Sequence, residues 1–361
     1  MKIKIFTPPR FNRQPLDMDY LDAVTDKKWQ YSGNGRSSIY HLLKDLNIEK
    51  ILIPVYICST VLIPLKQLGI EPIFYDLDTE DLNPSLISLK ELSKKHNIKT
   101  VLIASMYGNP ANMVEIEKYC KENHIFLIDD AAQSFGAKLD NRFIGTFGDG
   151  GFFSFSPGKP TATHMGSFFW SNTPIDIERT NHCFIHYIKW LNFYYNRYKI
   201  YEDKYLFLKK KLSIISLLLD KFLNRKDDNI CQFEKDIIGG VLRDNLEGRF
   251  EFRNKYSKIF FEKFKKNRYF RVLKSIRGIS HNHKLILIFN EKNIAKEFIA
   301  YLNRKSIYAS NGYRLLADDL QDLPNAKNID KKVVELPIEK DESKMNYLFD
   351  KVEAFEYSDK I

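Results

Sequence analysis

A single lysine separates two aromatic-rich segments that both resemble buried strands. The stretch "FFSFSPGKPTATHMGSFFW", residues 152–170, carries Lys159 between a Pro-Gly pair and another proline. Proline and glycine at this spacing predict a turn. A primary amine held in such a turn can form a Schiff base with a carbonyl group. Lys159 is therefore the first candidate for covalent chemistry.

An acidic pair precedes this lysine. In "FLIDDAAQSFGA", residues 126–137, a strand-like apolar run ends in Asp129 and Asp130, and Asp130 lies 29 residues before Lys159. Ligands of α/β proteins bind at the carboxyl ends of parallel strands. A helix N-cap formed by either aspartate is an equally good local interpretation.

A glycine-rich turn opens a helix near the N-terminus. The segment "YSGNGRSSIYHLLKDL", residues 31–46, places Gly35, Arg36 and Ser37 at the helix start. Free backbone N–H groups and the positive end of the helix dipole attract anions there. An ordinary capped helix start would have the same pattern.

The lysine, the aspartate and the helix start together match the contacts that pyridoxal 5'-phosphate requires. The lysine amine forms the Schiff base, the aspartate keeps the pyridine nitrogen protonated, and the helix start holds the phosphate. This cofactor explains why a cation is placed in a turn between two buried segments, because its amine must reach a ligand at the sheet edge.

The elements that would position these groups alternate along the first half of the chain. Short apolar runs typical of strands cover 50–56, 71–77, 100–108 and 125–131, and helical patterns cover 39–46, 60–68, 84–95 and 113–123. This alternation predicts an α/β domain with a parallel sheet.

The C-terminal part of the chain predicts a second, smaller α+β unit. Helical patterns cover 247–267 and 293–305, an apolar strand covers 284–290, and a final helix follows "VVELPIEKDES". We expect a large domain over 1–235 and a small domain over 236–361.

Composition narrows the class of protein. The chain has 361 residues, 44% of them hydrophobic, and neither a signal-peptide pattern at its start nor an uncharged apolar stretch of membrane-spanning length. A cytoplasmic protein is expected. Four cysteines lack any C-x-x-C pairing, so neither a disulfide framework nor a metal site is indicated; they are Cys58, Cys120, Cys183 and Cys231.

The net charge of +10 is concentrated in one segment. Residues 181–225 carry nine Lys or Arg against three Asp or Glu, interleaved with aromatic residues. This distribution argues against nucleic-acid binding. We expect a helical segment with solvated basic faces, whose cations could attract a diphosphate substrate. Contact with a membrane surface is the less favoured alternative.

At this point the chain resembles the DegT/DnrJ/EryC1/StrS family of PLP-dependent sugar aminotransferases. The resemblance is carried in order by "GRSS" (35–38), "ILIPVYICST" (51–60), "GIEPIFYDLD" (69–78), "SMYGNP" (105–110), "IDDAAQSFGA" (128–137), "IGTFGDGGFFSFSPGK" (144–159) and "VVELPI" (333–338). It implies a fold-type I transferase, similar to aspartate aminotransferase, with a mostly parallel mixed sheet between helices and a smaller C-terminal domain.

The resemblance also implies roles for individual residues. Lys159 would carry the Schiff base and transfer protons, and Asp130 would pair with the pyridinium nitrogen. Gln133 would lie near the ring face and Tyr56 would stack on it, with packing in the core as the alternative for Tyr56. Phosphate contacts would come from Gly35, Arg36, Ser37 and Ser154. Tyr313, in "YASNGYRLL", resembles a tyrosine of the small domain that faces the substrate.

The implied reaction moves an amino group from an amino acid, with glutamate expected, to a keto group of a nucleotide-linked deoxysugar in surface polysaccharide biosynthesis. Pyridoxamine 5'-phosphate would be the intermediate, and the enzyme would be a homodimer. Some relatives carry histidine in place of the lysine and act as dehydratases. Here Lys159 is in register and His164 falls five residues later, which favours transamination. A sugar dehydratase and a non-catalytic PLP-binding regulator remain alternatives.

Two departures from the family pattern stand out. The usual Gly-Gly after the lysine is Gly166-Ser167, and the glycine–asparagine–arginine motif that many relatives carry after the position of Asn172 is missing. The second departure leaves open which residues would contact the cofactor phosphate and the substrate across a subunit interface.

Overall fold

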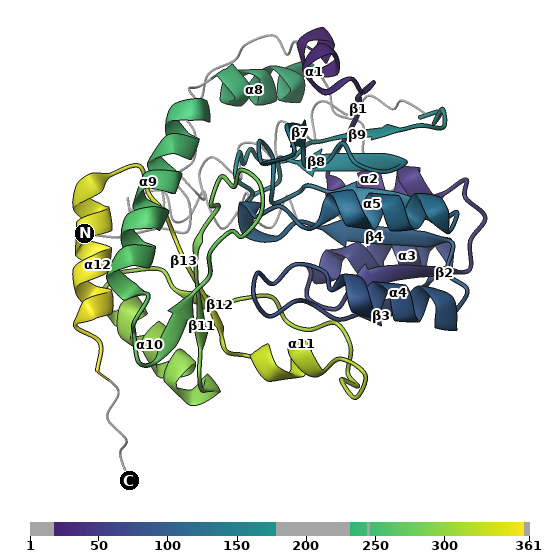
Figure 1. Ribbon diagram of the computed structural model, residues 1–361. Helices are drawn as coiled ribbons and strands as arrows, with labels where there is room; N and C mark the ends of the chain where they lie inside the picture. The colour runs from purple at the N-terminus through teal and green to yellow at the C-terminus, as the bar shows by residue number, and fades with distance from the viewer. Residues whose placement is uncertain (1–17, 178–231, 244–245, 357–361) are drawn as a thin grey trace, which may run out of the picture.

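The alternating strands and helices of the first half form one seven-stranded sheet (Figure 1). The computed structural model describes residues 18–177, 232–243 and 246–356. The strands are β1 Gln30–Ser32, β2 Lys50–Pro54, β3 Glu71–Tyr75, β4 Thr100–Ala104, β5 Phe126–Asp130, β8 Gly150–Ser154 and β9 Ser167–Ser171. Their order is β1-β9-β8-β5-β4-β2-β3.

The sheet is mixed but mostly parallel. Strands β3, β2, β4, β5 and β8 run parallel to one another, whereas β9 is antiparallel to β8 and β1 is antiparallel to β9. The predicted α/β class is therefore confirmed. The short strands β6 Lys138–Leu139 and β7 Arg142–Phe143 form a separate antiparallel pair.

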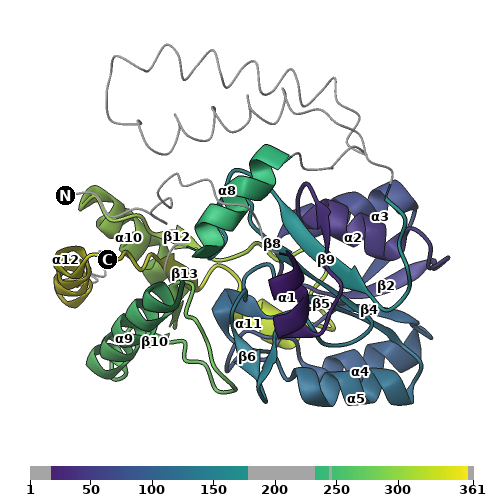
Figure 2. The same ribbon diagram turned by 90° about the horizontal axis from the view of Figure 1, so that it is seen from above.

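Helices cover both faces of this sheet, as Figure 2 shows. On one face lie α2 Gly35–Leu43 and α3 Leu62–Leu68; on the other lie α4 Leu86–Lys95 and α5 Met113–Glu122. Successive residues of β2 enter opposite cores: Ile51 and Ile53 pack with α2 and α3, whereas Leu52 packs with α4 and α5. This is the alternation expected of a strand buried on both sides.

The second unit is built on a four-stranded antiparallel sheet. Its strands are β10 Phe270–Val272, β11 Leu285–Phe289, β12 Ser310–Asn311 and β13 Val333–Leu336, in the order β10-β11-β13-β12. One face packs against α9 Leu246–Phe264, α10 Lys292–Arg304 and α12 Glu342–Glu353. Figure 1 shows these helices on the side away from the large sheet.

One hydrophobic core joins the two units. The opposite face of the small sheet contributes Ile286, Ile288 and Val333 to the same cluster as α2 and α3 of the large unit. Helix α11 Pro324–Ile329 adds a polar contact, because the backbone N–H groups of Asn325 and Ala326 donate to the Asp76 carboxylate at 2.8 Å each. The negative charge lies at the start of α11, where a helix dipole favours it.

Helix α1 Met18–Thr25 and helix α8 Gln232–Arg243 lie at the β1 side of the large sheet (Figure 1). Ile238 of α8 belongs to the core that α4 and α5 cover, whereas Tyr256 of α9 belongs to the small-unit core. The boundary expected at 235/236 thus falls inside α8. Helix α8 packs in the core of the large unit, and α9 packs in the core of the small unit.

One predicted strand is shorter than its apolar run. The run 100–108 continues β4 only to Ala104, and its last residues form the 3-10 turn η2 Met106–Gly108. Tyr107 adopts φ 58° there and is buried. Left-handed backbone is unusual for a bulky residue, and in this turn the Tyr107 hydroxyl hydrogen-bonds to Glu335 of the small unit.

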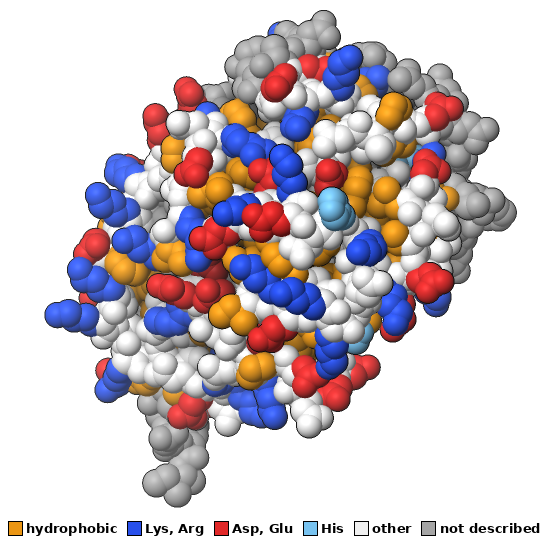
Figure 3. Space-filling model, turned by 45° about the vertical axis from the view of Figure 1, so that its right-hand side comes forward, with side chains coloured by type: hydrophobic (Ala, Val, Ile, Leu, Met, Phe, Trp, Pro, Cys, Tyr) orange, Lys and Arg blue, Asp and Glu red, His pale blue; other side chains and the backbone are white. Residues whose placement is uncertain are grey.

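The basic segment 181–225, with Cys183, lies outside the described residues, as does Cys231. Cys58 and Cys120 are free thiols. Among the described helices, none is both long and apolar enough to cross a bilayer. On the face shown in Figure 3, basic and acidic side chains are interspersed, as on an ordinary solvated surface.

Candidate active site

Lys159 lies in the connection between the antiparallel strands β8 and β9. The ends of this connection are pinned together, because Phe155 N–H donates to Gly166 O at 2.9 Å and Thr163 N–H donates to Phe155 O at 2.6 Å. Lys159 N–H donates to Ser156 O at 3.2 Å, which closes the turn, and Gly158 has φ +88°. The half-buried lysine is therefore held in the turn predicted for it.

Asp130 is the last residue of β5 and is buried. Its Oδ1 accepts a hydrogen bond from Ala132 N–H at 2.8 Å. Burial raises the pKa of the Asp130 carboxyl to about 6, and the nearby Lys159 ammonium opposes that rise. Lys159 is thus near enough to Asp130 for its charge to favour the ionised carboxylate at the carboxyl edge of the sheet.

The carboxylate of the neighbouring Asp129 binds backbone N–H groups of a later loop. Its Oδ2 accepts backbone hydrogen bonds from Gly145 at 2.6 Å and Phe147 at 3.1 Å. Burial raises its pKa to about 7, although these two hydrogen bonds oppose the rise. No helix follows the pair, since residues 131–136 form turns. The alternative of a helix N-cap is thereby excluded for both aspartates.

The start of α2 faces the end of β8. A Cβ atom on Gly35 would lie 3.2 Å from the Phe152 ring and 3.5 Å from Ser154 Cβ, so a larger residue would fill the space between them. The Asn34 side chain accepts from the N–H groups of Arg36 and Ser37, which makes it the helix cap. Gly35 therefore lies against Ser154 and Ser37 is buried in the first turn of α2, whereas the Arg36 side chain is exposed.

Ser167, where the family usually has the second glycine of a Gly-Gly pair, also hydrogen-bonds to the start of α2. Ser167 Oγ lies 2.7 Å from Ser38 Oγ, which lies 2.7 Å from Ser32 Oγ. Ser167 also donates to the Phe153 carbonyl. The hydroxyl that replaces a glycine thus ties β9 and β8 to the first turn of α2.

Tyr56 belongs to a chain of buried polar groups that links the two units. Its hydroxyl oxygen accepts from Tyr313 N–H at 3.2 Å and lies 2.7 Å from the Tyr107 hydroxyl. Tyr107 donates to Glu335 at 2.9 Å, and Glu335 also pairs with the Lys284 ammonium. The sequence predicted roles for Tyr56 and Tyr313. It did not predict that Tyr107, Glu335 and Lys284 belong to this chain of hydrogen bonds.

The phenols of this chain remain protonated. Burial raises the pKa of Tyr56 and of Tyr107 well above the ordinary value, and the charge of Glu335 adds to the rise in both. Because Tyr107 gives its single proton to Glu335, Tyr56 must donate to Tyr107. Tyr56 is therefore a satisfied buried hydroxyl with its ring at the carboxyl end of β2.

Gln133 lies against the end of β4. Its Oε1 accepts from Tyr107 N–H at 3.3 Å, and its Nε2 lies 3.6 Å from the sulfur of Met106. Gln133 comes three residues after Asp130 in the sequence. These contacts hold its side chain beside the left-handed turn of Tyr107.

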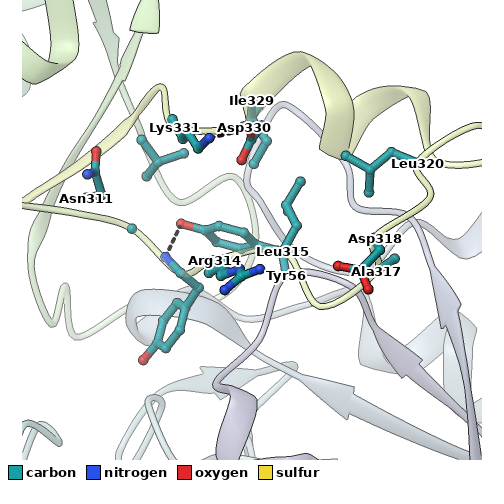
Figure 4. A pocket seen from close by; sticks show the side chains of 13 residues that line it. Tyr56, Asn311, Arg314, Leu315, Ala317, Asp318, Leu320, Ile329, Asp330 and Lys331 are labelled. Carbon is teal, nitrogen blue, oxygen red and sulfur yellow. Dashed lines mark hydrogen bonds and ion pairs between the residues drawn. The ribbon is translucent and has the colours of Figure 1, made fainter.

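A pocket of about 580 Å³ opens beside Tyr56 and Tyr313. Figure 4 shows the lining side chains around Tyr56, among them the charged groups of Arg314, Asp318 and Lys331. The pocket combines aromatic and aliphatic walls with cations of the small unit. Asp318 and Asp330 also line it, so the pocket suits a ligand that combines an apolar ring with polar groups.

The arrangement suits the cofactor proposed from the sequence. An amine on a pinned turn, a buried carboxylate at a strand end and a glycine cradle at a helix start lie along one sheet edge. Among the described residues, no group of three potential metal ligands occurs. His164 is buried 3.4 Å from Glu234 of α8, which links the lysine connection to that helix.

Residues 32–202 match the model of the DegT/DnrJ/EryC1/StrS aminotransferase family. The chain is similar to GDP-perosamine synthase of Escherichia coli O157:H7, with 28% identity over 152 residues, 41% of this chain and 42% of that protein. It spans less than half the length of the curated relatives it matches.

Solved structures share the fold over nearly the whole chain. An aminotransferase from Streptoalloteichus hindustanus has a TM-score of 0.75 at 15% identity, covering 98% of both chains. An E. coli GDP-4-keto-6-deoxy-D-mannose-3-dehydratase with bound hydrated PLP has a TM-score of 0.70 at 21% identity, covering 92% of this chain and 90% of that one. The predicted fold-type I architecture is confirmed, and the family resemblance read from the sequence is confirmed by the match of residues 32–202 to the DegT/DnrJ/EryC1/StrS aminotransferase family model.

Proposed function

We propose that the protein is a PLP-dependent aminotransferase that moves an amino group from an amino acid, with glutamate as the expected donor, to a keto group of a nucleotide-linked deoxysugar. The observation that carries the proposal is the placement of Asp130, buried at the carboxyl end of β5, near enough to the Lys159 turn that the lysine charge favours the ionised carboxylate.

The residues at this edge would divide the binding of the cofactor among them. Lys159 would attach it covalently, and Asp130 would hold a proton on the pyridine nitrogen. The corner of Gly35, Ser37 and Ser154 would receive the phosphate. When bound, pyridoxal phosphate supplies an electron sink for the carbon that loses its proton.

Lys159 also serves as the proton carrier in this proposal. Its turn is pinned at both ends, so the amine keeps one range of positions beside the sheet edge. General acid–base catalysis by a positioned side chain contributes about 10²–10⁴-fold to a rate. Gln133 and Tyr56 would confine the cofactor ring, since they follow β5 and β2, the strands on either side of β4.

The acceptor would enter the pocket beside Tyr56 and Tyr313. Arg314 and Lys331 supply cations for a diphosphate, and the aromatic wall suits a sugar or a base. We include Tyr313 as a substrate-facing residue, because it lines this pocket and its backbone N–H donates to Tyr56.

A dehydratase acting on a similar sugar is the second candidate, since one structural relative is a dehydratase. The presence of Lys159 favours transamination. A non-catalytic PLP-binding protein ranks below both, because such a protein has no chemical need for the lysine, aspartate and glutamine together. A homodimer remains a prediction from the family resemblance, and a cytoplasmic location remains a prediction from the composition of the sequence.

One half-reaction tests the proposal. The PLP-loaded protein is mixed with glutamate, and conversion of the bound cofactor to pyridoxamine phosphate is followed by absorbance. We expect conversion in the wild type and none in Lys159→Ala. A wild-type protein that binds PLP but does not convert it with any amino acid would refute the aminotransferase proposal.

A further inference from the structure

The segment 280–284 of the small unit reaches into the large unit and contacts three separate loops there. It lies in the β10–β11 connection, which Figure 2 shows passing beside the large unit near β6. Just before it, Ile279 pairs with Lys138 of β6 in an antiparallel bridge. The contacted loops follow β4, β5 and β8, which are the strands that carry the candidate active site.

The first contact is with the loop after β4. His283 N–H donates to Tyr107 O at 2.9 Å, and Ser280 Oγ donates to Asn109 Oδ1 at 2.7 Å. A Cβ atom on Gly108 would lie 2.7 Å from the His281 ring, so this glycine permits the close approach. The segment is therefore packed directly on the turn that presents Tyr107.

The second contact is with the loop after β5. His281 Nε2 lies 3.0 Å from Gln133 O, and the His281 ring stacks on Phe250 of α9 with centroids 5.2 Å apart. His281 is 1% exposed. This histidine fixes the backbone three residues after Asp130.

The third contact encloses Lys159. His283 Nε2 lies 2.9 Å from the carbonyl oxygen of Gly158, and Nη2 of Arg253, on α9, donates to the carbonyl oxygen of Pro160 at 3.0 Å. These are the residues immediately before and after Lys159. Two side chains from the small unit therefore hold the backbone on both sides of the lysine.

The chemistry of both donors suits a structural hydrogen bond rather than proton transfer. A carbonyl oxygen only accepts hydrogen bonds, so His283 Nε2 must carry the hydrogen and act as the donor. Burial lowers the pKa of His283, and Lys284 and Arg253 lower it further. The imidazole therefore stays neutral with a fixed tautomer.

We infer that His283 and Arg253 are positioning residues that hold the Lys159 turn from the small unit, so that the lysine amine is correctly placed only when the two units are docked. The inference deepens the proposed function and rests on it for the role of Lys159. Neither residue is close in sequence to any motif of the candidate site.

The test compares four variants at these two positions with one control variant. His283→Leu and Arg253→Met each remove one donor, whereas His283→Gln and Arg253→Lys keep a donor on a side chain of similar reach. Leu302→Ala, in the small-unit core behind β11, is the control for lost stability without any contact to the turn. Using two independent sites keeps the test decisive if one variant fails to fold.

Two measurements are made on each variant. The first is amide hydrogen exchange of peptides covering 155–163 in the protein without added cofactor. The second is the rate at which added pyridoxal phosphate becomes attached to Lys159, trapped with borohydride and located by mass spectrometry. We expect His283→Leu and Arg253→Met to exchange about tenfold faster and attach about tenfold more slowly, the change expected from losing one hydrogen bond of ~1.4 kcal/mol.

The conservative variants and Leu302→Ala should stay within about twofold of the wild type in both measurements at matched folded fraction, since a twofold change is ~0.4 kcal/mol. Unchanged exchange and attachment in both His283→Leu and Arg253→Met would overturn the inference. Failure of the wild type to attach the cofactor would instead refute the proposed function, while the exchange data would still decide whether these residues hold the turn.

Discussion

The hydroxyl groups of Tyr56 and Tyr107 lie 2.7 Å apart, and the Tyr107 hydroxyl donates a hydrogen bond to Glu335 of the small unit. The two tyrosines come from the ends of β2 and β4, which are neighbours in the large sheet. Their contact therefore connects the carboxyl edge of that sheet to the Glu335–Lys284 ion pair in the small sheet.

Removing one partner of the Glu335–Lys284 ion pair should destabilise the protein more than removing both partners. Glu335→Leu leaves the Lys284 ammonium buried without its counter-ion, and we expect a loss of about 3–5 kcal/mol in the free energy of unfolding. Lys284→Met combined with Glu335→Leu should cost clearly less than the Glu335→Leu variant alone. Urea unfolding of the two single variants and the double variant measures the coupling. Strictly additive single effects would show that the two charges do not depend on each other.

Asp130→Asn should impair catalysis much more than folding. The amide keeps the size of the side chain but cannot stabilise a proton on a pyridine nitrogen. We expect the glutamate half-reaction to slow by about 100-fold or more, the size typical of losing one preorganised electrostatic contact. Stopped-flow absorbance gives the rate, and urea unfolding gives the stability. A half-reaction within a few-fold of the wild type would mean that Asp130 does not serve the cofactor.

Asp129→Asn should remove a pH dependence of stability. Burial raises the pKa of Asp129 from 3.8 to about 7 in the folded protein. Between these values the native state binds more protons than the unfolded state, so this group lowers the free energy of unfolding as pH rises from about 4 to 7, by up to ~1.4 kcal/mol per pH unit.

The measurement for Asp129 is urea unfolding at pH 5 and pH 7. Buried histidines such as His41, whose pKa burial lowers to about 4, act in the opposite direction. The informative quantity is therefore the difference between Asp129→Asn and the wild type. We expect this difference in the free energy of unfolding, variant minus wild type, to be larger at pH 7 than at pH 5. The exposed Asp140→Asn serves as the control, and equal behaviour of the two variants would contradict the prediction.

Gly312→Ala should disturb the contact between Tyr313 and Tyr56. An added Cβ would overlap the hydroxyl oxygen of Tyr56, which is itself fixed by two hydrogen bonds. We expect a loss of about 1–3 kcal/mol from overpacking. Adding Tyr56→Phe removes the overlapping oxygen and should recover part of that loss, as measured by thermal unfolding. If the double variant loses more stability than the two single variants lose together, this explanation is excluded.

The sheet and the local motifs could be predicted from the sequence because their signals are local. The alternation of apolar runs and helical patterns placed β2 to β5 correctly, and the Pro-Gly turn placed Lys159 between β8 and β9. The Gly35 corner and Asp130 also follow from short motifs. In each case a few neighbouring residues determine the backbone conformation.

The contribution of the small unit could not be predicted in this way. Tyr107 and Glu335 are 228 residues apart in sequence, and His283 and Gly158 are 125 apart. Nothing in an apolar run such as 100–108 encodes the left-handed turn at Tyr107. The available signal was the cluster of polar residues at 280–284 immediately before an apolar strand, together with Gly108 in the opposing loop.

The shared core of the two units also bears on how the protein is made. Ile286, Ile288 and Val333 complete a cluster whose other members include Ile39, Leu65 and Ile128. During synthesis the ribosome releases the lysine turn well before it releases His283. We therefore expect a nascent chain that ends before residue 270 to expose part of this core and to capture the cofactor poorly. Assembly of the reactive site would then be coupled to completion of the polypeptide, which limits premature reaction of Lys159 with cellular aldehydes.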